Sequence, residues 1–223
     1  MKQRKIAASI LDADYVNLKP LLDKLIISGI DWIHYDVMDG HFVPSISFGS
    51  KILKNITASY DIIIDCHLMV TINENIEAYL IQYVQAGANS ITLHYEAIRN
   101  NQLEEFINFC HNNNIKSSIA LNPNTKIEVL KPYLKRLDMV LLMSVYPGKG
   151  GQKFIETTFK KISDLKQWIT KEESKTLIQV DGGINKITAK QCYENGADIL
   201  VVGSYLIKQE DITRTVRELK NGK

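Results

Sequence analysis

Four side chains that could bind a metal ion stand at the ends of three apolar runs. His34 and Asp36 lie in WIHYDVM, His67 in IIIDCHLMV and Asp181 in LIQVDGG. Side chains alternate between the two faces of a strand, so His34 and Asp36 point to the same side. Two imidazoles and two carboxylates suit zinc, iron(II), manganese or cobalt, whereas magnesium fits such a set poorly. We therefore predict one divalent metal ion per subunit, bound by these four residues.

Each of these histidines, taken alone, could instead be a hydrogen-bonded residue of the core. The four residues together favour a shared ion, because charged groups at the ends of apolar strands need partners to offset the loss of solvation. Asp65 lies two residues before His67, so its side chain faces the same side, deeper in the predicted barrel. A charged group there also needs a partner, which the sequence does not reveal. Cys66 faces the opposite side. His94, at the end of another run, either lines the site or has a structural role.

The elements that must position these residues are strand-like apolar runs, which alternate with amphipathic helical segments along the whole chain. The eight predicted strands span residues 5–11, 32–37, 62–69, 90–94, 116–121, 139–144, 176–180 and 199–202. Eight such units favour an α/β fold, a single (β/α)8 TIM barrel, over an open, doubly wound sheet. We expect residues 1–223 to form one domain, with its chemistry at the C-terminal ends of the strands.

Three of the turns that lead from a helix into a strand share a pattern: SGID, AGAN and NGAD. Gly29, Gly87 and Gly196 are predicted to take the left-handed conformation that ends a helix. The recurrence is a weak internal repeat with the period of one βα unit, and it supports the barrel.

Composition excludes several classes of partner. The net charge is +2, from 27 basic and 25 acidic residues without a basic block, so we expect no nucleic acid partner. No apolar stretch approaches the roughly 20 residues that cross a bilayer, so we expect no membrane association. Cys66, Cys110 and Cys192 are odd in number and show no CxxC pairing, which argues against disulfides and fits a cytoplasmic protein.

Seven strings carry a resemblance to a known family: SILDADY, HYDVMDGHFVP, DCHLMV, LNPNT, LLMSVYPGKGGQKFI, VDGGI and VVGS. In this order and spacing, over nearly the whole chain, they resemble the ribulose-phosphate 3-epimerase family. The resemblance implies that His34, Asp36, His67 and Asp181 bind the divalent metal. It also implies that Asp36 and Asp181 act as the catalytic acid-base pair and that Ser9 contacts the substrate, a ketose phosphate.

The resemblance further implies a mobile loop over the substrate, which contains Gly148, Gly150 and Gly151. The sequence departs from the family pattern in this loop, where Tyr146 and Lys149 replace the usual Asn and Phe. Asp12 likewise stands where a Ser is common. These departures leave the metal and acid-base positions intact, but they bear on how the loop contacts substrate.

Glycine-rich turns follow the last two predicted strands, where barrels commonly bind phosphate through backbone N–H groups. The residues expected to bind phosphate there are Gly182, Gly183, Gly203 and Ser204. Lys149, at the tip of the flexible loop, either reaches the phosphate or is solvated. His67 and Asp181 are expected to contact the substrate as well as the metal.

The implied reaction interconverts D-ribulose 5-phosphate and D-xylulose 5-phosphate through an enediolate. A metal ion would stabilise the developing negative charge, while two carboxylates on opposite faces of the sugar exchange the proton at carbon 3. Met38, Met69 and Met143 share the side of the site and would give it a flexible apolar lining, although ordinary core packing explains methionines equally well.

Three alternatives stay open. An allulose-6-phosphate 3-epimerase keeps the same metal and carboxylate set. A decarboxylase or aldolase of the related phosphate-binding barrels carries D-x-K-x-x-D on a strand end, and HYDVMD lacks the lysine. A non-catalytic sugar-phosphate-binding barrel would not need opposed carboxylates. The resemblance also leads us to expect a homo-oligomer.

Overall fold

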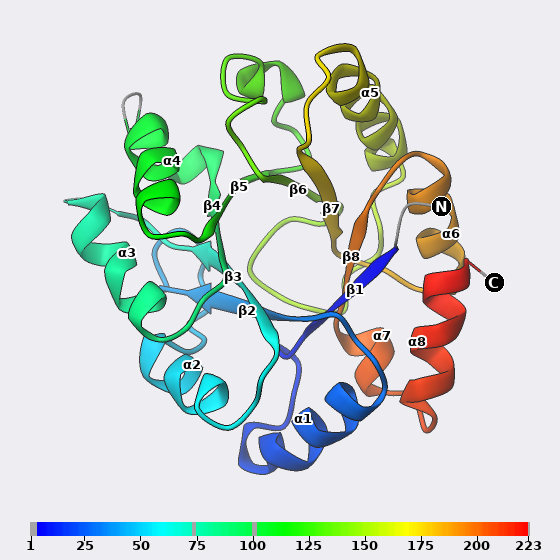
Figure 1. Cartoon of the computed structure of the whole chain (residues 1–223). Coiled ribbons are helices and arrows are strands. Elements are labelled where there is room, and N and C mark those ends of the chain that lie inside the picture. Colours follow the sequence, from blue (N-terminus) through cyan, green and yellow to red (C-terminus); the bar gives the residue numbers. More distant parts are fainter. Residues whose placement is uncertain (1–3, 73–74, 100–101, 223) are drawn as a thin grey trace.

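Eight parallel strands close into a barrel in the computed structural model, which describes residues 4–72, 75–99 and 102–222 (Figure 1). The strands are β1 Lys5–Ser9, β2 Trp32–Met38, β3 Ile63–Met69, β4 Ser90–His94, β5 Lys116–Leu121, β6 Met139–Met143, β7 Leu177–Asp181 and β8 Ile199–Val202. Each strand pairs with the next along the chain, and β8 pairs with β1. The predicted (β/α)8 barrel is therefore confirmed, and the closed ring excludes an open sheet.

The predicted strands agree with the observed ones to within two residues at each end. The largest difference is at β1, which was expected to reach Leu11 and ends at Ser9. The chain turns there because the Leu11 amide donates to the Ser9 hydroxyl and the Ala13 amide donates to the Ile10 carbonyl.

Helices surround the barrel and cover the outward faces of its strands (Figure 1). They are α1 Leu18–Ile27, α2 Ser50–Thr57, α3 Ile76–Gln85, α4 Gln102–Asn112, α5 Thr157–Lys171, α6 Lys186–Glu194, α7 Ser204–Ile207 and α8 Ile212–Asn221. The expected helix after β5 is reduced to a 3₁₀ helix, Ile127–Leu130, followed by turns. Pro132 has no N–H to continue a helical ladder at that point. No helix among the described residues has the length and apolar character that a bilayer span requires.

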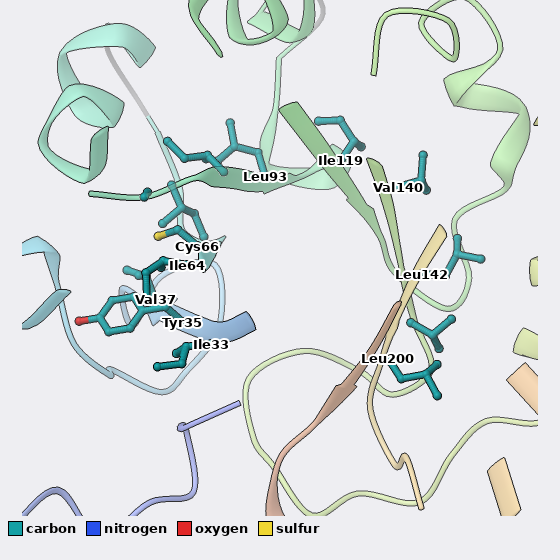
Figure 2. Close-up of a cluster of buried hydrophobic side chains, with 14 of the residues drawn as sticks. Ile33, Tyr35, Val37, Ile64, Cys66, Leu93, Ile119, Val140, Leu142 and Leu200 are labelled. Carbon is teal, nitrogen blue, oxygen red and sulfur yellow. The ribbon is translucent and has the colours of Figure 1, made fainter. Parts of the chain in front are cut away.

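The alternation of side chains along each strand divides the barrel into two environments. Outward-facing residues such as Ile33, Tyr35 and Cys66 pack in the apolar layer between the strands and the helices (Figure 2). The residues between them in sequence, such as His34, point into the barrel. The hydroxyl of Tyr35 donates to the carbonyl of Gly49, 2.8 Å away, which satisfies its polar atom within the apolar layer. The outer layer supplies the burial that stabilises the fold and leaves the inward positions available for chemistry.

The repeated turns at the N-terminal ends of the strands are built as predicted. Their glycines have positive φ angles: 81° at Gly29, 93° at Gly87 and 108° at Gly196. Two residues after each glycine, a side-chain oxygen accepts a backbone N–H of the preceding strand: Asp31 from Ile6 (2.8 Å), Asn89 from Ile64 (2.8 Å) and Asp198 from Ile178 (2.9 Å). Each turn therefore ties two neighbouring strands together where their regular pairing begins.

Candidate active site

The register between β2 and β3 brings the inward-facing polar residues together. It sets three pairs side by side: His34 with Asp65, Asp36 with His67, and Met38 with Met69. Asp181 joins them from the C-terminal end of β7, on another side of the barrel. The alternate residues of each strand that face inward therefore form successive layers of one site at one end of the barrel.

One potential ligand atom from each of His34, Asp36, His67 and Asp181 lies within 4.8 Å of the other three. The His34 Nε2 atom is 3.2 Å from both His67 Nδ1 and Asp36 Oδ1. His67 Nδ1 is 3.0 Å from Asp36 Oδ1, and Asp181 Oδ2 is 4.0 Å from each of the two ring nitrogens. A tetrahedral ion with ligands at about 2.1 Å separates them by roughly 3.4 Å, so this spacing fits a single small divalent cation.

The hydrogen bonds behind His34 direct one of its ring nitrogens at the shared centre. Its Nδ1 lies 2.8 Å from Asp65 Oδ2, and Asp65 also accepts from the amide of Gln179 (2.6 Å) and the hydroxyl of Ser90 (2.8 Å). Asp65 therefore acts as an ionised acceptor and keeps the hydrogen of His34 on Nδ1. These contacts identify the partner that the sequence required for Asp65.

Electrostatics at the centre favour a positive charge. Burial opposes protonation of His34, but the neighbouring carboxylates of Asp36 and Asp65 outweigh it and raise the pKa of that ring well above its usual value. Two ring nitrogens that face each other at 3.2 Å need a proton or a cation between them. The donor set and its charge thus fit a divalent metal ion, which would replace that proton.

The two carboxylates differ in their surroundings. Burial would raise the pKa of Asp36, but contacts with His34 and His67 lower it below its usual range. Burial raises the pKa of Asp181 to about 7, although the charge of His34 opposes the shift. The Ser9 hydroxyl donates to Asp36 Oδ2 at 2.7 Å and holds that carboxylate in place. Without a bound cation, the pKa values of the two carboxylates are therefore shifted in opposite directions.

A pocket of about 300 Å³ opens at this end of the barrel, and both Asp36 and Asp181 line it. The other lining residues that the sequence singled out are Ser9, Asp12, Met38, Met69, Met143, Gly148, Lys149, Gly150, Gly151, Gly182, Gly183, Gly203 and Ser204. His67, expected to contact substrate, does not line the pocket, because its side chain is 0% exposed. It faces the shared centre and not the space that a substrate would occupy.

The turn after β7 needs its glycines. Gly182 and Gly183 have φ angles of 114° and 61°. A Cβ on Gly182 would overlap the Val145 side chain, and one on Gly183 would lie 2.5 Å from the Phe154 amide nitrogen. Only glycine lets the backbone come this close to its neighbours while bordering the pocket.

The loop that follows β6 curves across the middle of the barrel (Figure 1) and lines the pocket with residues 147–152. The Ser45 hydroxyl donates to the Gly148 carbonyl at 2.7 Å, which ties the loop to the segment after β2. The Gln152 side chain donates to the carbonyls of Tyr146 (2.7 Å) and Lys149 (2.9 Å). One hydrogen bond therefore ties the loop to a neighbouring segment, and the two from Gln152 fix its internal shape.

Three residues depart from the family pattern: Tyr146 and Lys149 lie in this loop, and Asp12 follows β1. Tyr146 is exposed, and its hydroxyl accepts a hydrogen bond from the Asn124 side chain at 2.8 Å. Asp12 lines the pocket and packs against Gly150, where a Cβ would overlap the Asp12 carboxylate. Gly150 is thus the loop residue that accommodates the larger side chain at position 12.

Sequence reasoning missed some residues near the site. Tyr205 and Lys208 line the pocket beyond the predicted Ser204, and no pattern had marked them. His94, whose role the sequence left open, contacts His67 from behind and does not line the pocket. Glu96 contacts His94 in turn, and its place two residues after a histidine at a strand end is the signal that could have identified it.

Known proteins agree with this architecture. The model of the family described as "Ribulose-phosphate 3 epimerase family" matches residues 5–207. The ribulose-phosphate 3-epimerase of Bacillus subtilis (strain 168) is 39% identical over 220 residues, which cover 98% of this chain and 99% of that protein. The ribulose-phosphate 3-epimerase of Chlamydia muridarum is 42% identical over 210 residues, which cover 93% of this chain and 90% of the relative.

Solved structures of low identity share the fold. The 3-hexulose-6-phosphate synthase of Salmonella typhimurium has a TM-score of 0.72 at 16% identity, with 98% of this chain and 97% of that chain covered. This likeness supports the barrel alone. The family match and the near full-length relatives carry the assignment: the chain belongs to the ribulose-phosphate 3-epimerase family of isomerases.

Proposed function

We propose that the protein interconverts D-ribulose 5-phosphate and D-xylulose 5-phosphate by inverting the configuration at carbon 3. The observation that carries this proposal is the pair formed by Asp36 and Asp181. Both carboxylates line one pocket, and they come from strands on different sides of the barrel. The family membership supports the same substrate class.

Inversion next to a ketone requires a base on one face of the sugar and an acid on the other. Asp36, kept ionised by its histidine contacts, removes the proton from carbon 3, and Asp181 returns a proton to the opposite face. In the reverse direction the two residues exchange roles. The planar intermediate between these steps is an enediolate, whose lifetime depends on how well the site stabilises negative charge.

The metal centre would provide that stabilisation. A zinc, iron(II), manganese or cobalt ion held by His34, Asp36, His67 and Asp181 would act as a Lewis acid toward the oxygens of the ketose. The protein contributes the orientation of the ligand atoms. Asp65 fixes His34, and Ser9 fixes Asp36.

The rest of the pocket fits a phosphorylated sugar. The turns at Gly182–Gly183 and Gly203–Ser204 border the end of the pocket where we place the phosphate, and Lys149 lines the same pocket from the loop above. Met38, Met69 and Met143 are almost fully buried and give the site an apolar lining. With the loop over the pocket, this lining keeps water away from the enediolate.

A metal-restoration assay tests the proposal. The protein is stripped with a chelator, each of the four metals is restored separately, and turnover of D-ribulose 5-phosphate is compared with that of D-allulose 6-phosphate. We expect activity only with metal, and a larger kcat/KM for the pentulose phosphate. A larger kcat/KM for the hexulose phosphate would reassign the substrate, and full activity of metal-free protein would contradict the mechanism.

A further inference from the structure

A line of three side chains, His67, His94 and Glu96, leads away from the metal centre. His67 Nε2 lies 2.9 Å from His94 Nε2, and His94 Nδ1 lies 3.2 Å from Glu96 Oε2. The two rings are stacked with centroids 5.0 Å apart, and both histidines are fully buried. None of the three side chains lines the pocket, so the line acts on the centre and not on a bound substrate.

Glu96 is fixed at the outer end of this line. Its Oε1 accepts from the Asn122 backbone N–H at 2.9 Å and from the Thr125 hydroxyl. The Asn122 carbonyl is itself held by Lys161 of α5 at 2.8 Å. Burial would raise the pKa of Glu96, but its contacts with His94, Thr125 and Asn122 lower it, so the side chain is an ionised acceptor.

The hydrogen positions follow from these contacts. His67 Nε2 and His94 Nε2 face each other at 2.9 Å, so one of these two nitrogens must donate a hydrogen and the other must accept it. An ionised Glu96 keeps the His94 hydrogen on Nδ1, which makes His94 Nε2 an acceptor. His67 then donates from Nε2, and its Nδ1 lone pair points at the metal centre.

We propose that His94 and Glu96 are positioning residues that select the His67 tautomer able to bind the metal ion. The proposal rests on the metal centre of the proposed function. It extends that centre from four residues to a line that begins at Glu96, near the protein surface. Asp65 has the same role toward His34. Each histidine of the centre is therefore oriented by its own carboxylate, His34 directly by Asp65 and His67 by Glu96 through His94.

The substitution Glu96→Gln should reverse the direction of the hydrogen bonds from residue 96 through His94 to His67, with little change in side-chain shape. The Asn122 N–H can only donate, so it keeps the amide oxygen of Gln at the Oε1 position and places the NH2 group against His94 Nδ1. His94 would then carry its hydrogen on Nε2, and His67 would carry its own on Nδ1, where it blocks the metal. We expect zinc affinity to fall about 10- to 100-fold.

A matched control comes from the same side of the barrel. Glu128 is exposed on the 3₁₀ helix Ile127–Leu130, so Glu128→Gln removes an equal charge without touching the line. The zinc dissociation constants of the unaltered protein and of both variants are measured by competition with a chromophoric chelator. An affinity of Glu96→Gln equal to that of Glu128→Gln would overturn the proposal.

A spectroscopic measurement on the unaltered, zinc-loaded protein decides the matter even where Glu96→Gln folds poorly. Long-range proton–nitrogen NMR spectra should show the His94 hydrogen on Nδ1 and the His67 hydrogen on Nε2. A His94 hydrogen on Nε2 would overturn the proposal. If zinc binds with this pattern but D-ribulose 5-phosphate is not turned over, the proposed function fails while the positioning role stands. Absence of binding by zinc, iron(II), manganese and cobalt alike would overturn both.

Discussion

Aspartates at the two ends of the barrel have different surroundings and different roles. At the N-terminal ends of the strands, Asp198 is buried; its Oδ2 accepts the Ile178 backbone N–H, and its Oδ1 lies 3.7 Å from the Lys166 ammonium. At the C-terminal ends, Asp36 and Asp181 face histidines and a pocket. An aspartate that accepts a backbone N–H and faces a lysine away from the pocket stabilises the fold. One that meets other titratable groups at a pocket is available for chemistry.

The strongest test of this comparison removes, one at a time, the negative charges of the two aspartates at the pocket. Asp36→Asn and Asp181→Asn should each lower kcat by at least about 10³, or roughly 4 kcal/mol of barrier, because an amide cannot exchange a proton at carbon 3. Steady-state kinetics with D-ribulose 5-phosphate measure the loss. Asp198→Asn is the matched control, since its amide oxygen still accepts from Ile178 and its kinetics should be unchanged.

A smaller effect is expected at the glycine turn after β7, which borders the pocket. Gly182→Ala would force a Cβ into Val145 at a φ angle of 114°, so the turn must move. Displacing a substrate-holding segment by about 1 Å can cost on the order of 10² in rate, and we expect a loss of that size in kcat/KM. Normal kinetics in this variant would show that the turn does not position the substrate.

At the opposite end, Asp198→Ala should affect stability and leave chemistry unaltered. It removes the acceptor of the Ile178 N–H, and a buried donor without a partner costs about 1–3 kcal/mol. Urea unfolding monitored by circular dichroism gives the change in the free energy of unfolding. An altered kcat in the folded variant would contradict the division between the two ends.

The smallest effect is expected for Gly29→Ala. No atom lies within 4 Å of the Cβ that this substitution adds, so the cost comes from the φ angle of 81° alone. We expect the free energy of unfolding to fall by about 1–2 kcal/mol, with kcat and KM unchanged. Both Gly29→Ala and Gly182→Ala put alanine at a positive φ angle, but only Gly182 borders the pocket. Comparing them therefore separates the effect of backbone strain from the effect of its location. A kinetic defect of similar size in both would remove that distinction.

The parts of the molecule that were predictable from the sequence depend on local patterns. The apolar runs and their alternation with helices gave the barrel, and the parity of His34, Asp36 and His67 placed them on the inner face. The glycine at the end of a helix is likewise a local signal, as at Gly29. In each case the residues involved are close neighbours in the chain.

What could not be predicted depends on register between distant segments. Asp65 accepts a hydrogen bond from Gln179 across the barrel, 114 residues away in sequence, and no local sequence pattern predicts that contact. Glu96 is fixed by Asn122 and Thr125 of the segment after β5, whose loss of a helix was also not foreseen. Such contacts arise only when the closed ring sets neighbouring strands in register.

The fate of the hydrogen at carbon 3 tests the account most directly. D-xylulose 5-phosphate is converted by the zinc-loaded protein in deuterium oxide, and the D-ribulose 5-phosphate formed is examined by proton NMR. The carboxylate that returns a proton to carbon 3 is not the one that removed it, and between turnovers it takes up deuterium from the solvent, so we predict deuterium at carbon 3 in nearly every product molecule. Product that retains its original hydrogen at carbon 3 would contradict proton transfer by Asp36 and Asp181.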